Sequence, residues 1–390
     1  MAELSWAQVA AWRMSRGHLA ARVGPEALIE TVEDICGLHA QIMSSAELSV
    51  WARVSGVSRA DLQTALWEER RLVKLWAMRG TLHLLSSARY PDWQAALNTY
   101  EHFNSAAFKR YFGVGAEEIN EIVAAIRVVL ADGPLTREEM AQRVADHLGI
   151  PERAEQLTGS WGPLLKPASF RGALCFAPSD GQRVRFARPD RWLPALSRRP
   201  VDAPAESAST ADGDQAVREV LRRYLRACGP ASREDFARWW AISAAKAGKR
   251  IRELTDEVVQ VSVAGEPRWL LAEDRAGMES AKPARVVRLL PAFDPYVIGI
   301  TGHSEQLLPD PQLRARVHRP QGWVSPVLVV DGRLAGIWQH EVKAGTLIVT
   351  VEPFGRQPAW VRRSAVAEAD LLADFLGAAA TEVTWTRQSD

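Results

Sequence analysis

Ser232-Arg233-Glu234-Asp235-Phe236 is one of three occurrences of the same short phrase in this chain, the others being Thr136-Arg137-Glu138-Glu139-Met140 and Ser58-Arg59-Ala60-Asp61-Leu62. Each follows a glycine by a few residues and sets an acid three positions after a hydroxyl residue. That spacing is typical of a capping box, in which the two side chains satisfy backbone N–H groups at the start of a helix. The copies lie about 80 to 100 residues apart, too far for a solenoid repeat, which predicts three copies of a small domain.

The third copy shows best what that domain is. A helix before the box carries apolar residues at helical spacing, and a basic helix and two strands come after it. This order is that of a helix-turn-helix with a wing. The predicted elements are helices over Gln215–Cys228, Ser232–Trp240 and Ser243–Leu254 and strands over Val258–Val263 and Trp269–Leu271, around a turn at Gly265-Glu266-Pro267.

The other two copies predict a similar ribbon after the box. In the second, strands over Ala173–Ala177 and Arg183–Ala187 flank the turn Ser179–Gln182, and in the first, strands over Val73–Met78 and Thr81–Leu85 meet at Arg79-Gly80. Capping boxes are common in helical proteins, so the alternative to a domain repeat is that the three boxes coincide by chance. The shared order of elements favours the repeat.

The sequence pattern of the last hundred residues predicts mainly β-strands, whereas the preceding segments predict mainly helices. Asp331-Gly332 lies between two apolar runs and is a strong hairpin signal. The segment Pro291–Tyr296 (Pro-Ala-Phe-Asp-Pro-Tyr) predicts a rigid elbow before them. We expect a small β-barrel-like domain with strands over Val286–Leu290, Trp323–Val330, Arg333–Trp338 and Thr346–Val351, closed by a helix over Ser364–Leu376.

The chain is therefore expected to be an α+β protein with three tandem winged-helix domains and a C-terminal β domain. The small, acidic stretch from Val201 to Asp214 is its clearest linker. The proposed domains are residues 1–112, 113–200, 214–282 and 283–390.

Composition points to a cytoplasmic protein. The 390 residues are 47% hydrophobic, enough for several full cores, yet no apolar run approaches the ~18 residues that span a bilayer. The N-terminus lacks the basic and apolar regions of a signal peptide. The three cysteines (Cys36, Cys175 and Cys228) form no CxxC pair and are expected to be small core residues in a reducing compartment.

The net charge is only +1, but the basic residues are unevenly distributed. Residues 160–199 and residues 218–252 are both strongly basic, and they fall on the second and third winged units. If each patch lies on one face, it would be suited to DNA phosphates. The alternative is a solvated helix surface in an arginine-rich sequence.

Few residues offer catalytic chemistry. The chain has no phosphate-binding loop, HExxH motif, CxxC zinc pattern or GxSxG elbow. One polar phrase stands out, Gly37-Leu38-His39-Ala40-Gln41, at the end of an apolar helix. If the helix ends at His39, the side chains of His39 and Gln41 can converge on one water molecule. Alternatively, His39 caps helix carbonyls and Gln41 is a surface amide.

Four segments together resemble the winged-helix DNA glycosylases of the AlkZ-like group, and the resemblance covers nearly the whole chain. They are Gly37–Gln41, Trp76–Leu84, Leu289–Tyr296 and Val329–Trp338. Members of that group remove N7-alkylated purines, and some unhook interstrand crosslinks. The resemblance implies a catalytic phrase of glutamine, an apolar residue, then glutamine or aspartate. Gln41 matches that phrase, whereas His39 departs from it and corresponds by position only.

The implied enzyme is a monofunctional N-glycosyl hydrolase of base excision repair or genotoxin self-resistance. An N7-alkylated purine is cationic and leaves without protonation, so the enzyme has to place a water molecule and stabilise charge on the sugar. Gln41 would accept a hydrogen bond from that water, and His39 would orient it or accept its proton, because an imidazole with an ordinary pKa of about 6.5 suits neutral pH. No cofactor or metal is expected.

The expected partner is double-stranded DNA carrying alkylated purines, bound by a monomer without a membrane. The candidate DNA-binding residues are Arg79, His83, Lys166, Arg171, Arg183, Arg185, Lys246, Lys249 and Arg250. Two other classes of protein stay open: a dimeric transcription regulator, which needs neither His39 nor Gln41, and a non-catalytic binder of DNA damage or of a ligand.

Overall fold

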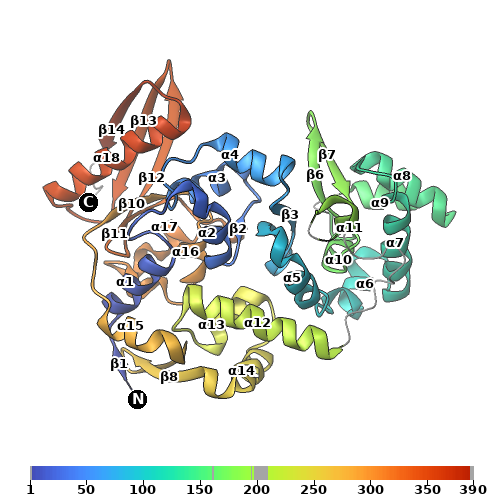
Figure 1. Cartoon of the computed structure of the whole chain (residues 1–390), viewed down its shortest axis with the longest axis horizontal. Helices are drawn as coiled ribbons and strands as arrows, with labels where there is room; N and C mark the ends of the chain where they lie inside the picture. Colours follow the sequence, from blue (N-terminus) through green and yellow to red (C-terminus); the bar gives the residue numbers. More distant parts are fainter. Residues whose placement is uncertain (1, 160–161, 195, 197–209, 387–390) are drawn as a thin grey trace. The chain divides into compact units, whose positions relative to one another are not determined.

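The computed structural model describes residues 2–159, 162–194, 196 and 210–386, and the chain folds into two compact units (Figure 1). Met1–Leu62 and Leu221–Asp390 form the first, which we call the terminal unit, and Gln63–Val220 form the second, the middle unit. These units are a different and coarser division than the four domains expected from the sequence, whose boundaries stay a prediction. Most of the expected linker lies outside the described residues, and its end already belongs to helix α12 (Thr210–Cys228).

The middle unit contains a hairpin and a helical subdomain with a small sheet. Strand β7 pairs antiparallel with both β5 and β6. Strand β5 lies between α7 and α8 in the chain, and β6 and β7 follow α9, an order consistent with a winged helix. The elements are β3 (Leu72–Trp76), β4 (Leu82–Ser86), α5 (Tyr90–Leu97), α6 (Ala106–Phe112), α7 (Ala116–Val129), β5 (Leu135–Thr136), α8 (Arg137–Leu148), α9 (Glu152–Thr158), α10 (Lys166–Phe170), β6 (Cys175–Asp180), β7 (Arg183–Ala187) and α11 (Pro189–Trp192).

All three capping boxes form. Thr136 caps α8, with its Oγ accepting from the Glu139 backbone at 3.2 Å while Glu139 accepts from the Thr136 backbone at 2.9 Å. Ser58 with Asp61 makes the same reciprocal bonds at α4 (Arg59–Gln63), and Ser232 with Asp235 makes them at α13 (Arg233–Trp240). The ribbon after the first box is also confirmed, because β3 and β4 pair antiparallel across Arg79-Gly80.

The third copy lies mostly in the terminal unit and has the predicted order. After α12 and α13 come α14 (Ala244–Glu253) and the antiparallel strands β8 (Val258–Val263) and β9 (Glu266–Leu271). The sequence did not indicate the third strand of this sheet, β1 (Glu3–Leu4), which pairs in parallel with β8. The tandem arrangement of three winged helices is consistent with these elements and stays a prediction.

The expected C-terminal β-barrel is wrong, because five strands form an open sheet in the order β10-β11-β12-β13-β14. The last strand, β14, lies at an edge in parallel with β13, and the helix that connects them packs on the sheet next to β10 and β14 (Figure 1). A helix on one face buries the apolar side without closing the sheet. The bounds are β10 (Val287–Leu290), β11 (Val327–Val330), β12 (Arg333–Lys343), β13 (Thr346–Pro353), α18 (Ala359–Leu376) and β14 (Ala380–Trp385).

The Asp331-Gly332 hairpin is confirmed, and its turn packs against the N-terminal helix α1 (Trp6–Arg16). Both turn residues have positive φ, 50° and 82°, as a two-residue hairpin requires. A Cβ on Gly332 would lie 2.7 Å from Cβ of Ala10, so only glycine fits this approach. The N-terminal segment and the C-terminal sheet therefore share one hydrophobic core, which includes Met14, Trp51 and Leu328.

The terminal unit contains six further α-helices and β-strands among its described residues. They are α2 (Leu28–Asp34), β2 (Leu38–His39), α3 (Met43–Trp51), α15 (Arg275–Ser280), α16 (Pro295–Gly299) and α17 (Arg314–Val317). No helix in the described parts of the chain is long and apolar enough to cross a membrane.

A buried polar network connects α1 to the cap of α13. Arg13 lies 2.7 Å from Nε2 of His303, and Nδ1 of His303 lies 3.5 Å from Asp235. Because arginine only donates hydrogen bonds, Nε2 accepts and the ring proton faces Asp235. Burial, with the charge of Arg13, lowers the pKa of His303 to about 4, although Asp235 acts in the opposite direction. His303 is therefore neutral in the folded protein at neutral pH.

We expect the protein to lose stability as the pH falls from about 6.5 to 4. The unfolded chain protonates His303 near its ordinary pKa, whereas the folded protein holds it neutral down to about pH 4, so protons favour unfolding in this window. The loss from this group is at most about 3 kcal/mol. Urea unfolding at several pH values should show a shallower loss for His303→Gln, whose amide can keep both contacts. Equal pH dependence in the two proteins would contradict the assignment.

Candidate active site

The segment Gly37–Gln41 follows a helix that ends earlier than the sequence suggested. Helix α2 ends at Asp34, not at His39, because Cys36 and Gly37 take positive φ values of 59° and 90°. The Gly37 N–H donates to the Val32 carbonyl at 2.8 Å, which closes the helix end. The chain is then extended in the short strand β2.

Extended backbone sends successive side chains to opposite sides. Leu38 and Ala40 are completely buried, which leaves His39 and Gln41 for the other side of the segment. His39 is buried, and Gln41 is exposed in the bend two residues after β2. This burial pattern is consistent with His39 and Gln41 on one side of the segment, in a strand and the bend after it and not at a helix end. Their pairing as catalytic residues stays a prediction.

The elbow provides the aromatic ring that covers His39. The ring of Phe293 stacks on the His39 imidazole, with centroids 4.7 Å apart and an angle of 14° between the planes. Phe293 has a φ of 58°, a conformation that costs energy for a bulky residue and persists only when the surroundings impose it. The elbow predicted from the sequence therefore places the ring of Phe293 against His39.

A buried ion pair imposes this conformation. Asp294 accepts two hydrogen bonds of 2.7 Å from the guanidinium of Arg53, and both side chains are almost inaccessible to solvent (0% and 1% exposed). Asp294 also accepts from the Tyr296 backbone at 2.9 Å and so caps α16. Sequence reasoning missed Arg53, because no local pattern distinguishes it from the many other arginines.

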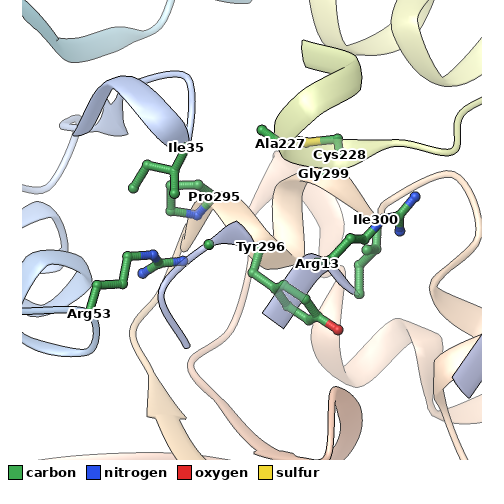
Figure 2. A pocket seen from close by; sticks show the side chains of 10 residues that line it. Arg13, Ile35, Arg53, Ala227, Cys228, Pro295, Tyr296, Gly299 and Ile300 are labelled. Atoms are coloured by element: carbon green, nitrogen blue, oxygen red, sulfur yellow. The ribbon is translucent and has the colours of Figure 1, made fainter. Parts of the chain in front are cut away.

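A small pocket lies beside the elbow (Figure 2). Arg13, Arg53 and Tyr296 contribute to its wall, together with Ile35 and Cys228. Its lining contains neither His39 nor Gln41. The two candidate catalytic residues therefore lie outside this pocket, and Gln41 is open to solvent.

Two of the three cysteines are core residues, as expected. Cys36 and Cys175 are buried, and burial raises the pKa of both thiols, so neither is suited to act as a nucleophile. Cys228 is half-buried. Within the described ranges, no three His, Cys, Asp or Glu side chains gather into a group that could hold a metal ion.

Six of the candidate DNA-binding residues lie in the middle unit. Arg183 and Arg185 lie on β7, in the wing, and Arg183 is paired with Asp180. Lys166 lies beside the β3–β4 turn that carries Arg79, because a Cβ on Gly80 would lie 3.3 Å from the Lys166 side chain.

Two further middle-unit candidates differ in their exposure. Arg171 stacks over Phe103 and donates to Asn120 at 2.6 Å. His83 is buried, with Nδ1 3.0 Å from the Thr81 carbonyl oxygen, so its side chain offers no phosphate contact.

The other three candidates lie on α14 in the terminal unit. Lys246 is in the first turn of the helix, whose cap is Ser243. Lys249 and Arg250 both approach Glu253, at 3.9 and 2.9 Å. Glu253 partly offsets their charge, but the Lys249 side chain is largely exposed. The structure therefore places the predicted basic residues in both units.

Comparison with known proteins gives one consistent result. Residues 32–375 match the model of the family described as DNA glycosylase AlkZ-like. A curated relative from Streptomyces sahachiroi, named interstrand DNA cross-link repair glycosylase, is 32% identical over 352 residues, which are 90% of this chain and 91% of the relative. The solved structure of Streptomyces sahachiroi DNA glycosylase AlkZ superposes with a TM-score of 0.86 and 31% identity, covering 98% of this chain and 100% of that one. The chain therefore belongs to the AlkZ-like family of DNA glycosylases.

Proposed function

We propose that this protein is a monofunctional DNA glycosylase that hydrolyses the N-glycosidic bond of N7-alkylated purines, including bulky adducts and interstrand crosslinks. Membership of the AlkZ-like family supports glycosylase activity, and the name of the curated relative supports crosslinks as a substrate class. The observation that carries the proposal is the segment His39-Ala40-Gln41, in which a buried imidazole held by Phe293 precedes an exposed amide.

The chemistry requires little from the protein beyond a positioned water molecule. Alkylation at N7 makes the purine cationic, so the base departs as a neutral molecule without a general acid. The sugar develops positive charge, and a water molecule has to attack its anomeric carbon. Gln41 accepts a hydrogen bond from this water through its carbonyl oxygen. The ring of His39 accepts or orients the other hydrogen, and its stack on Phe293 limits its rotation.

The exposure of Gln41 suits the proposed substrates. Most enzymes that act on a base rotate it out of the duplex into a tight pocket, which a base crosslinked to the opposite strand cannot enter. The pocket in the terminal unit is lined by neither His39 nor Gln41. An exposed catalytic residue can approach a lesion that leaves the base stack without entering a closed pocket.

DNA would be held through its phosphates by basic side chains of both units. The residues that we propose are Arg79, Lys166, Arg171, Arg183, Arg185, Lys246, Lys249 and Arg250, with His83 left out because it is buried. Lys166 is half-buried, and desolvation lowers the pKa of its amine, whereas a phosphate beside it would favour the charged form. We propose that the protein acts on DNA as a monomer.

We expect the wing and the third recognition helix to bind DNA without regard to sequence. Replacing Arg183 and Arg185 by alanine, or Lys249 and Arg250, should weaken binding to every duplex and reduce the slope of log K against log salt by about 0.9 for each phosphate that is no longer neutralised. Fluorescence anisotropy at several salt concentrations measures that slope. Arg275→Ala is a matched control, since Arg275 is an exposed arginine paired with Glu279 on α15. Unchanged slopes in a double variant would remove that site from the interface.

The proposed activity is tested by release of free base. Methylated DNA incubated with the protein should yield 7-methylguanine and abasic sites, and strand breaks should appear only after later alkaline treatment, as a monofunctional enzyme requires. A duplex with an N7–N7 crosslink should separate into single strands under denaturing conditions. Sequence-specific binding of undamaged DNA with no base release from either substrate would favour the transcription regulator instead.

A further inference from the structure

Trp323 is the only tryptophan of the described residues whose side chain is exposed, with 41% of its surface accessible. It lies in the terminal unit, in the loop between α17 and β11. Removing an indole from water lowers the free energy, so an exposed tryptophan ring is well suited to stack on a ligand.

The loop holds Trp323 in a defined position. Gln321 and Gly322, which precede it, both have positive φ, 61° and 77°, and form a tight turn. The Trp323 carbonyl accepts from the Arg319 N–H at 2.8 Å, and the next carbonyl, that of Val324, accepts from the Phe293 N–H at 3.3 Å. The last bond attaches the loop to the elbow. The turn and these backbone hydrogen bonds therefore fix the position of Trp323 in the loop.

The indole belongs to the same aromatic cluster as the candidate catalytic residue. Trp323 contacts the ring of Phe293 edge to face, with centroids 5.1 Å apart and planes at 73°. Phe293 in turn stacks on His39. Trp323 is therefore one ring removed from His39, at the exposed end of the cluster.

We propose that Trp323 binds the alkylated purine by stacking on its cationic ring, and that this contact distinguishes the lesion from neutral bases. The inference rests on the proposed function, because His39 and Gln41 define where the lesion lies. A tryptophan face attracts a cation more strongly than any other side-chain ring. A neutral guanine gains ordinary stacking on the same face, whereas an N7-alkylated guanine gains stacking and cation–π attraction. Trp323 is thus a substrate-binding residue that responds to the charge which makes the base labile.

The test is the preference for a damaged duplex over an undamaged one. The probe is a duplex with one 7-methylguanine on a 2′-fluorinated sugar, which resists hydrolysis, and the reference is the same duplex with guanine. We expect Trp323→Ala to reduce the ratio of the two affinities by about 5- to 30-fold. The affinity for the reference duplex should fall less than that for the damaged one, because neutral guanine loses only ordinary stacking. Trp323→Phe should lie between the parent and the alanine variant. Trp323→Leu should resemble alanine, because leucine keeps apolar contact but has no π face.

Two controls separate this contact from a structural role. Tyr111→Ala removes an exposed aromatic ring of the middle unit, 83% accessible, and should leave the ratio unchanged. Thermal melting of each variant checks folding, and Trp323→Phe preserves a ring against Phe293. A ratio that is the same in the parent, Trp323→Ala and Trp323→Leu proteins would overturn the proposal.

The outcome for Trp323 is distinguishable from the outcome for the proposed function. In one case the parent protein prefers the damaged duplex through Trp323 but releases no base from the cleavable duplex. This result would support the stacking contact and contradict the glycosylase activity. In the other case the parent protein releases base, and Trp323→Ala shows the same preference and the same rate as the parent. This result would support the glycosylase activity and contradict the stacking contact.

Discussion

Gln41→Ala should slow base release by about 10²-fold or more while leaving the affinity for DNA almost unchanged. If Gln41 holds the attacking water, its interaction is made chiefly in the transition state, so its loss lowers the rate and not the binding. Gln41 is exposed in the bend after β2, so truncation there should leave the core intact. Single-turnover excision of 7-methylguanine measures the rate, and anisotropy measures the affinity.

His39 should behave in the same way, with one informative difference. His39→Ala should also lose about 10²-fold or more in rate, whereas His39→Gln restores the phrase found in the family and should keep measurable activity. If the imidazole accepts a proton, the parent rate will fall when that ring is protonated at low pH, and His39→Gln will lose that dependence. Rates from about pH 5.5 to 8.5 would show it.

Ser44→Ala provides a matched control for both positions. Ser44 is exposed and lies three residues after Gln41, in the first turn of α3, so a general disturbance of this segment would affect it too. Because His39 stacks on Phe293, the melting temperature of each His39 variant has to accompany its rate. Full activity in Gln41→Ala and His39→Ala would contradict a catalytic role for both residues. Gln41 would then be a surface amide and His39 a core histidine.

The largest effect on stability is expected at the buried pair of Arg53 and Asp294. Asp294→Ala leaves the guanidinium charge buried and without its partner, which typically costs about 3 to 5 kcal/mol. The same change removes the cap of α16 and releases the strained Phe293. Base release at a temperature where the variant is still folded should also fall, since the ring against His39 loses its support. Urea unfolding at neutral pH gives the free energy.

An exposed pair and a double variant separate charge from packing. Breaking the pair of Arg275 and Glu279 with Glu279→Ala should cost no more than about 1 kcal/mol, because both side chains are exposed. Arg53→Met combined with Asp294→Leu leaves no buried charge and should recover part of the stability lost in Asp294→Ala. A loss in Asp294→Ala as small as that in Glu279→Ala would show that the pair does not hold the elbow.

Local sequence determined the elements that depend on nearest neighbours. The three capping boxes close within four residues, so Ser58, Thr136 and Ser232 could be read directly. The Asp331-Gly332 hairpin follows from the backbone freedom of two adjacent residues. The polar phrase at His39 and Gln41 was recognisable for a similar reason, because few polar residues interrupt the apolar run around it.

Where sequence reasoning failed, a distant contact was decisive. Alternating strands are equally compatible with a barrel and with an open sheet, and the choice was made by α18, which covers one face and returns the chain to form β14 at the edge. Helix α2 ended at Asp34, five residues before the expected end, because Cys36 and Gly37 take left-handed conformations that the apolar pattern does not reveal.

The surroundings of the candidate site were decided by tertiary structure alone. Arg53 and Asp294 are 241 positions apart, and neither carries a local signal that it pairs with the other. Phe293 and Trp323 come from different loops and contact each other, and Phe293 stacks on His39, which is distant in the sequence. Spacing in the sequence can therefore indicate which side chains have the right chemistry, whereas the groups that hold and cover them are chosen by long-range packing and by the burial of a charge that must find its partner.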